Sequence, residues 1–241
     1  MPILSAFGAA RTIPGSSGVV NDYSYDFNGS SYLRYPSSSS FAIGTQEFSI
    51  ECFVYLNSYP SYLSPAAVIL DFGYAVTSGN QRVQFFINSS GQPAFVRNNR
   101  PVSSSSTSVI SSEALSLSTW TYIAVSRLST GVVHIYVNNN VRGTASNLSG
   151  TISSGTGVIP SVGTGSVETT RFLNGKISNL RFNLGSSIST ATVPTSPLTA
   201  QATTKMLTCQ SSTVKDNSVA NGGGPWTLTN SGVLVSSSGP F

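Results

Sequence analysis

The chain has 241 residues, only 8% of them charged, and a formal net charge of +4 at pH 7. Because an average globular protein is about a quarter charged, hydroxyl and amide groups must solvate most of this surface. The basic residues are scattered, which argues against nucleic-acid binding, and the longest apolar runs fall far short of the roughly 20 residues that a membrane-spanning helix needs.

The first 20 residues show no hydrophobic periodicity and contain Pro14, Gly15 and Gly18. We therefore expect residues 1–20 to form an irregular arm, a possible anchor that becomes ordered only when a partner holds it. The short apolar stretch near the start has no basic residue before it, so a signal peptide is not expected. Residues 21–241 are predicted to form a single β-sandwich domain.

From Tyr23 onward, short runs rich in valine, isoleucine and aromatic residues alternate with clusters of serine, glycine, asparagine and proline. The pattern predicts strands over residues 23–27, 31–35, 48–56, 67–73, 82–88, 93–98, 120–127, 132–138, 141–147, 172–183, 204–211, 226–230 and 232–236. No helical repeat exceeds two turns. The prediction is an all-β fold of two packed antiparallel sheets.

Several connections have the composition of turns or loops. In INSSGQPAF the Ser-Ser-Gly cluster supplies a positive φ for a hairpin, and the three asparagines of VNNNVRG tolerate left-handed conformations. The Asn174-Gly175 pair predicts a further tight turn, and the serine runs at 37–40 and 103–106 predict loops.

The two cysteines, Cys52 and Cys209, each lie among apolar neighbours and have no metal-ligand spacing. Their composition favours small buried side chains, with a single disulfide as the alternative.

The order of these segments, from DFNGSSYLRY and FSIECFVYL through WTYIAVSRLSTGVVHIYVN to FLNGKISNLRF, resembles the laminin-G-like, concanavalin-A-like jelly roll over residues 23 to about 185. The flanking segments, MPILSAFGAA and the stretch from TSPLTAQATT to the end, resemble laminin-G-like structural proteins of tailed bacteriophages, particularly those of marine cyanobacterial hosts. That resemblance implies a virion protein: a decoration protein, a fibre or an adhesin. It also implies that the C-terminal strands complete the sandwich beside the N-terminal ones, bringing Cys52 close to Cys209.

Enzymatic chemistry has few candidates in this sequence. Glycoside hydrolysis needs two carboxylates across one sugar, and the nearest pair is Glu47 with Glu51, of which Glu51 lies opposite the apolar face of its strand. The single histidine, His134, alternates with valine and isoleucine and is expected on the outer face of a sheet. The sequence also contains no GxSxG motif that would provide a nucleophile for it. We therefore expect no enzyme activity and no cofactor.

Calcium is the one metal to consider, because laminin-G-like and pentraxin-like folds often hold it at one rim through clustered oxygen ligands. The available side chains are Asp22, Asp26, Asn28 and Asp71, although Asp26 and Asn28 can equally be turn residues.

Sugar recognition needs aromatic faces with amide or hydroxyl groups nearby, and the candidates are Tyr55, Tyr59, Tyr62 and Tyr74. These tyrosines could instead pack under loops or form a subunit interface. Strand edges without lysine favour a homo-oligomer or docking on a larger shell. The predicted function is a non-enzymatic virion protein that contacts other virion proteins through its arm or sheet edges. The alternatives are a lectin-like adhesin for host glycan and, remotely, a polysaccharide depolymerase.

Overall fold

The computed structural model describes residues 22–61, 66–74, 81–99, 107–146, 152, 157–165, 171–219 and 223–241. Its elements are β1 (Ser24–Asn28), β2 (Tyr32–Arg34), the 3-10 turn η1 (Ser39–Phe41), β3 (Phe48–Leu56), β4 (Ala66–Tyr74), β5 (Gln81–Asn88), β6 (Pro93–Asn99), β7 (Thr107–Ile110), β8 (Thr121–Arg127), β9 (Val133–Val137), β10 (Asn140–Ala145), β11 (Val158–Val162), β12 (Asn174–Leu184), β13 (Thr204–Thr208), β14 (Thr229–Ser231) and β15 (Leu234–Ser236).

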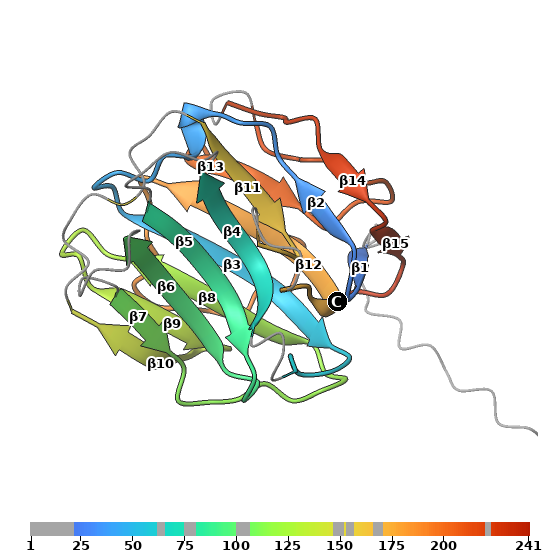
Figure 1. Ribbon diagram of the computed structural model, residues 1–241, viewed down its shortest axis with the longest axis horizontal. Helices are drawn as coiled ribbons and strands as arrows, with labels where there is room; N and C mark the ends of the chain where they lie inside the picture. The colour runs from blue at the N-terminus through green and yellow to red at the C-terminus, as the bar shows by residue number, and fades with distance from the viewer. Residues whose placement is uncertain are drawn as a thin grey trace, which may run out of the picture.

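The strands form two antiparallel sheets packed face to face, as the sequence predicts (Figure 1). The eight-stranded sheet has the order β10-β9-β8-β3-β12-β1-β15, with β13 also paired to β12. The seven-stranded sheet, which lies in front in Figure 1, has the order β14-β2-β11-β4-β5-β6-β7. The C-terminal strands β14 and β15 lie beside β2 and β1, the arrangement that the resemblance implies.

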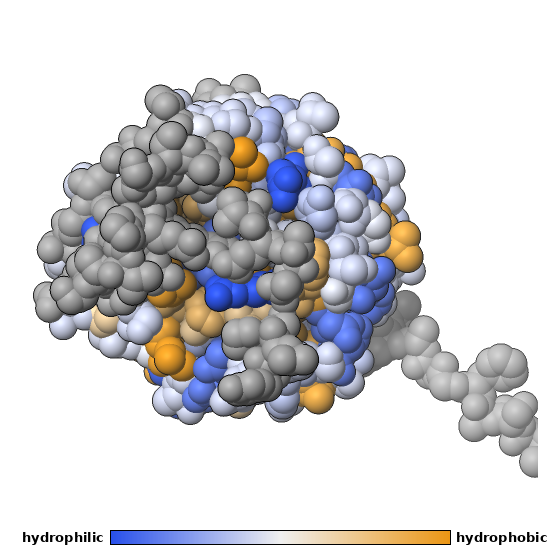
Figure 2. Space-filling view, viewed as in Figure 1, coloured by the Kyte–Doolittle hydropathy of each residue, from blue (hydrophilic) through white to orange (hydrophobic). Residues whose placement is uncertain are grey.

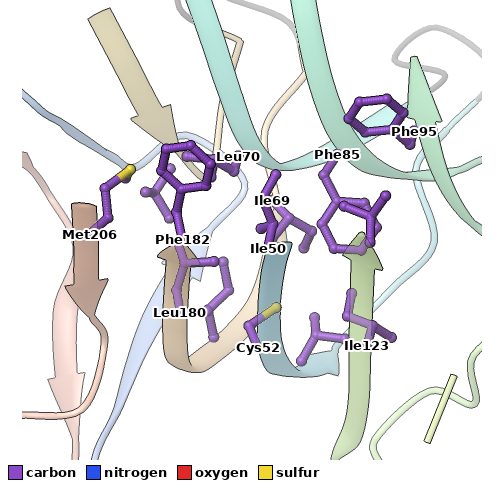
Figure 3. Close-up of a cluster of buried hydrophobic side chains, with 14 of the residues drawn as sticks. Ile50, Cys52, Ile69, Leu70, Phe85, Phe95, Ile123, Leu180, Phe182 and Met206 are labelled. Carbon is purple, nitrogen blue, oxygen red and sulfur yellow. The ribbon is translucent and has the colours of Figure 1, made fainter. Parts of the chain in front are cut away.

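The core lies between the two sheets because every second residue of each strand points inward. On β3, Phe48, Ile50, Cys52, Val54 and Leu56 are all buried in one hydrophobic cluster. Figure 3 shows side chains of the eight-stranded sheet facing those of the other sheet, with Cys52 among them.

Both cysteines are buried free thiols, which confirms the prediction of small core side chains. Burial raises the pKa of each thiol, so both are protonated at neutral pH.

Two strands are absent from the sequence prediction. Strand β11 was missed because it contains Pro160, which cannot donate to a ladder and argues against a central strand. Pro160 is nevertheless tolerated between β2 and β4, where it pairs with Phe72 and its carbonyl accepts from Tyr35 N at 2.9 Å. Strand β7 was missed because its four residues follow a serine-rich stretch.

The predicted turn at Asn174-Gly175 is wrong, because both residues belong to β12. Gly175 is needed for a close approach instead: a Cβ there would lie 2.2 Å from the carbonyl oxygen of Tyr55 on β3. The serine run at 37–40 also differs from a plain loop, since η1 buries Phe41. The other two turns are confirmed, with positive φ at Gly91 (78°) and Asn138 (53°).

An extended segment covers part of the outer face of the eight-stranded sheet. We call residues 186–203, which connect β12 to β13, the strap. Ile188, Ala191 and Val193 pack on a small cluster centred on Phe53 and Tyr122. Side chains of the sheet bind the strap's backbone: Ser126 Oγ accepts from Ile188 N (2.7 Å), Tyr136 OH donates to Ile188 O (2.8 Å), Asn139 Oδ1 accepts from Val193 N (2.8 Å), Asn179 Oδ1 accepts from Leu198 N (2.8 Å) and Arg181 Nη1 donates to Thr199 O (2.8 Å).

The surface has the character that the composition predicts. In Figure 2, which shows the side of the seven-stranded sheet, residues of intermediate hydropathy cover much of the described surface. Strongly polar and apolar residues are scattered among them. Within the described ranges, no helix is long and apolar enough to cross a bilayer.

Candidate functional site

A hollow in the described surface lies at one end of the sandwich. It has a volume of about 250 Å³ and is lined by residues 58–61 after β3, Gly29 between β1 and β2, Ala67 of β4, Phe172 just before β12 and Asn174 at the start of β12. We call it the rim pocket. It brings together four segments that are distant in sequence.

Tyr59 is one of the residues that line the rim pocket, and its ring is held in a fixed position. Its hydroxyl donates to the carbonyl oxygen of Leu115 at 2.6 Å, and its ring abuts Gly91, where an added Cβ would lie 2.5 Å from the ring. Leu115 N in turn donates to the Gly91 carbonyl at 2.9 Å. The ring is therefore held at its edge and on one side, while 39% of the residue stays exposed. Such a fixed aromatic face can stack on an apolar surface of a ligand at little entropic cost.

Amide and hydroxyl groups line the pocket beside this ring. Asn174 Nδ2 donates to Ser58 Oγ at 3.0 Å, and Asn57 Nδ2 donates to Asn174 Oδ1 at 3.2 Å. Because these contacts are exposed, their remaining donor and acceptor positions can reach a ligand hydroxyl.

The turn between β1 and β2 positions the opposite margin of the pocket. Asn28 Oδ1 accepts from the backbone N–H groups of Ser30 and Ser31, each at 3.0 Å. Gly29, with φ at 83°, donates from its N–H to the Leu173 carbonyl at 2.9 Å. This bond ties the turn to the segment that carries Phe172 and Asn174.

The structure places the four predicted tyrosines apart. Tyr59 lines the rim pocket, whereas Tyr55 lies on the outer face of the eight-stranded sheet and packs against Trp120, with ring centroids 5.6 Å apart. Tyr74 ends β4 and pairs with Val158. Tyr62 lies outside the described residues.

Sequence reasoning missed Phe172 and Asn174 as site residues. The run FLNGKI has the pattern of a strand, and nothing local in it shows that its first residues cross from one sheet to the other. The Asn-Gly pair at 174 was the only available signal.

The four calcium candidates do not converge, so they do not fit one calcium ion. Asp22 accepts from Phe241 N at 3.0 Å, and burial raises its pKa. Asp26 pairs with Lys176 at 3.3 Å, and Asn28 holds its turn. Asp71 is buried in the other sheet, where its carboxylate accepts from Gln84 Nε2 at 3.3 Å. Among the described residues, no group of three or more His, Cys, Asp or Glu side chains could hold a metal ion.

The residues weighed for catalysis are also separate from the rim pocket. His134 is on the outer face as predicted, and its Nδ1 lies 3.0 Å from Thr144 Oγ1. Glu47 Oε2 accepts from Ser187 Oγ at 2.6 Å. Glu51 is on the outer face as predicted, but it is buried by the strap and bonded to Tyr122 OH at 2.7 Å. Burial and this carboxylate together raise the pKa of Tyr122 far above its usual value.

Comparison with known proteins decides the family. A laminin G model described as the concanavalin A-like lectin/glucanases superfamily matches residues 27–183. The chain belongs to this superfamily. Members of the concanavalin A-like superfamily share a fold, which does not by itself fix a function. No curated protein sequence matches the chain.

Three solved structures illustrate the likeness of this concanavalin A-like chain. A Bacteroides ovatus protein, named for a proposed role in carbohydrate binding, is 14% identical with a TM-score of 0.55, covering 90% of this chain and 60% of its own. Domain 4 of an arabinanase from Geobacillus stearothermophilus, in complex with arabinotriose, is 16% identical with a TM-score of 0.53, covering 69% and 72%. A Ruminococcus gnavus sialidase module bound to sialyllactose is 11% identical with a TM-score of 0.52, covering 69% and 91%. At these identities the likeness shows the fold alone.

Proposed function

We propose that this chain is a non-catalytic carbohydrate-binding domain whose glycan site is the rim pocket. The observation that carries the proposal is the fixed ring of Tyr59 beside the exposed amide of Asn174 and hydroxyl of Ser58. A sugar ring has an apolar C–H face, which can stack on the Tyr59 ring. Its hydroxyl groups can form hydrogen bonds with the polar groups of Asn174 and Ser58. The carbohydrate-binding relatives of the same fold support this reading.

The absence of catalysis is part of the proposal. Glycoside hydrolysis needs two carboxyl groups about 5 to 9.5 Å apart across one bond, and no described residue that lines the rim pocket is acidic. Glu51 belongs to the acid pair that comes nearest to a catalytic pattern in the sequence. Its carboxylate instead forms an ion pair with Arg181 and accepts a hydrogen bond from Tyr122.

The test is glycan binding by matched tyrosine variants on a printed glycan array, followed by titration of the best glycan. Tyr59→Ala should lose at least tenfold in affinity, because it removes the stacking face. Tyr55→Ala is the control, since Tyr55 packs on Trp120 on another face of the molecule. Equal loss in both variants, or wild-type affinity in Tyr59→Ala, would contradict the proposed site.

We further propose that the domain is displayed on a bacteriophage virion, as the resemblance of both flanking segments implies. Purified virions should then contain many copies of this protein. Virions that lack the protein would refute its display on the particle. Removing residues 1–20 should abolish attachment while the sandwich keeps its melting temperature; attachment without them would refute the anchor.

Self-association through sheet edges is the related proposal. The edge strands β7 and β10 contact each other at one side of the sandwich, contain no lysine, and expose Ile110 and Val141. Such edges favour pairing with another subunit. Sedimentation of the wild-type protein and of Val141→Lys tests this self-association. The wild type should sediment as an oligomer, and the added charge should shift it towards monomer. A monomeric wild-type protein would contradict the proposal.

A further inference from the structure

The chemistry of the rim pocket narrows the class of sugar that it can hold. We infer that the rim pocket binds one uncharged sugar residue, and that the Phe172 and Tyr32 rings beside it support the next residue of an oligosaccharide. This inference rests on the proposed function and specifies its ligand.

The first argument is charge. Among the residues that the structure describes, every side chain that lines the pocket is uncharged. The nearest cation along the chain, Arg171, directs its Nη1 to Gln84 Oε1 at 3.1 Å, on the seven-stranded sheet. Lys176, two residues beyond Asn174, is paired with Asp26 at 3.3 Å. A uronic or sialic acid would therefore lose hydration of its carboxylate in the pocket without gaining a cationic partner there, which selects against it.

The second argument is size. The pocket volume of about 250 Å³ falls below the range of about 300–1,000 Å³ that is usual for drug-sized ligands. One pyranose or furanose ring, stacked on Tyr59, fills a space of this kind. A second sugar residue must lie outside the pocket.

The third argument is the surface that continues from the pocket. Phe172 lines the pocket and also contacts Tyr32 of β2, with ring centroids 6.4 Å apart. Both rings are partly exposed. They extend the apolar surface from the pocket towards the outer side of β2, where the guanidinium of Arg34 lies 5.1 Å from the Tyr32 ring centroid. The requirement for an uncharged residue therefore applies to the pocket and not to the surface near Arg34.

The experiment uses NMR titration of the full chain with methyl glycosides of glucose, galactose, mannose and arabinose, and with glucuronate and galacturonate. At least one neutral glycoside should bind ten times more tightly than either uronate, with the largest shift changes near Tyr59. The variant Ser58→Arg, which adds a cation at the exposed pocket wall, should reduce that preference.

Extension is tested with the di- and trisaccharides of the preferred neutral sugar. These should bind at least fivefold more tightly than the single sugar, and Tyr32→Ala should remove that gain. Tyr32→Phe keeps the ring and should keep the gain, and a melting curve of each variant checks folding.

The outcomes separate the two proposals. Tyr59-dependent binding of uronates as tight as that of neutral sugars would overturn the inference and leave the proposed function standing. An affinity that does not increase beyond one residue would overturn the extension over Tyr32. A chain that binds no glycan on the array or in these titrations would overturn the proposed function itself.

Discussion

Glu51 on β3 and Arg181 on β12 form a largely buried ion pair, in which Glu51 Oε1 accepts from both Nη2 (2.7 Å) and Nε (2.9 Å) of Arg181. The second carboxylate oxygen accepts from Tyr122 OH at 2.7 Å. Arg181 also donates to the strap at Thr199 O, so the pair joins three strands and the strap. The acid that lies nearest to a catalytic pattern in the sequence is therefore part of the scaffold.

Removing the cation of this pair should be costly. Arg181→Met leaves the Glu51 carboxylate buried without its partner, and we expect the free energy of unfolding in urea to fall by about 3–5 kcal/mol. Adding Glu51→Gln to that variant removes the uncompensated charge and should recover much of the loss. Unchanged urea midpoints in Arg181→Met would show that the pair does not stabilise the fold.

Gly91→Ala should weaken glycan binding in the rim pocket strongly while lowering the stability of the fold only slightly. The new Cβ would lie 2.5 Å from the Tyr59 ring and displace it, so glycan affinity should fall about tenfold. The matched control is Gly44→Ala, which has a similar positive φ of 60° but no atom within 4 Å of the added Cβ. Both variants should lose about 1 kcal/mol of stability from backbone strain. Wild-type affinity in Gly91→Ala would mean that the position of Tyr59 does not govern binding.

Stability should fall steeply in alkaline solution because four tyrosines are buried. Burial raises the pKa of four tyrosines above the ordinary value near 10, namely Tyr25, Tyr35, Tyr122 and Tyr136. Cys209, Asp216 and Glu51 add to the effect at Tyr25, Tyr35 and Tyr122 respectively. Because the pKa of each such tyrosine is higher in the folded than in the unfolded state, its protonated hydroxyl contributes fully to the free energy of unfolding below pH 10. That contribution is lost as the pH rises above 10.

Each of these tyrosines should lower the free energy of unfolding by about 1.4 kcal/mol per pH unit above pH 10. Urea unfolding between pH 8 and pH 11, with tyrosinate absorbance at 295 nm, measures this slope. Tyr122→Phe should reduce it by one tyrosine's share. Titration of all ten tyrosines near pH 10 without unfolding would contradict the prediction.

The strap should open when its buried contact is made polar. Ala191 is 4% exposed and packs with Phe53, Tyr122 and Tyr136, so Ala191→Asp should cost about 3 kcal/mol and speed amide exchange of the strap. The neighbouring exposed position provides the control, and Thr192→Asp should change neither quantity. Equal exchange rates in the two variants would indicate that the apolar contact does not hold the strap.

Alternation in FSIECFVYL and VVHIYVN was sufficient to predict which side chains enter the core and that Glu51 and His134 face outward, because strand geometry sends successive residues to opposite faces. The succession of short apolar runs and turn clusters was sufficient to predict an all-β fold, and the composition was sufficient to predict a weakly charged surface. Two local rules were misleading because long-range contacts override them. Proline disfavours a central strand, yet Pro160 lies in one. An Asn-Gly pair favours a turn, yet Gly175 lies in β12, where it allows the close approach to β3.

The rim pocket was beyond the sequence because its walls come from four distant segments. Tyr59 was a candidate from its loop, but its fixed orientation depends on Leu115 and Gly91, and its partners Phe172 and Asn174 arrive from over 100 residues away. Likewise, Glu51 gained its partner only when β12 was paired beside β3. Strand patterns are local and can be read along the chain, whereas the pairing of strands decides which side chains meet, and only the tertiary structure contains it.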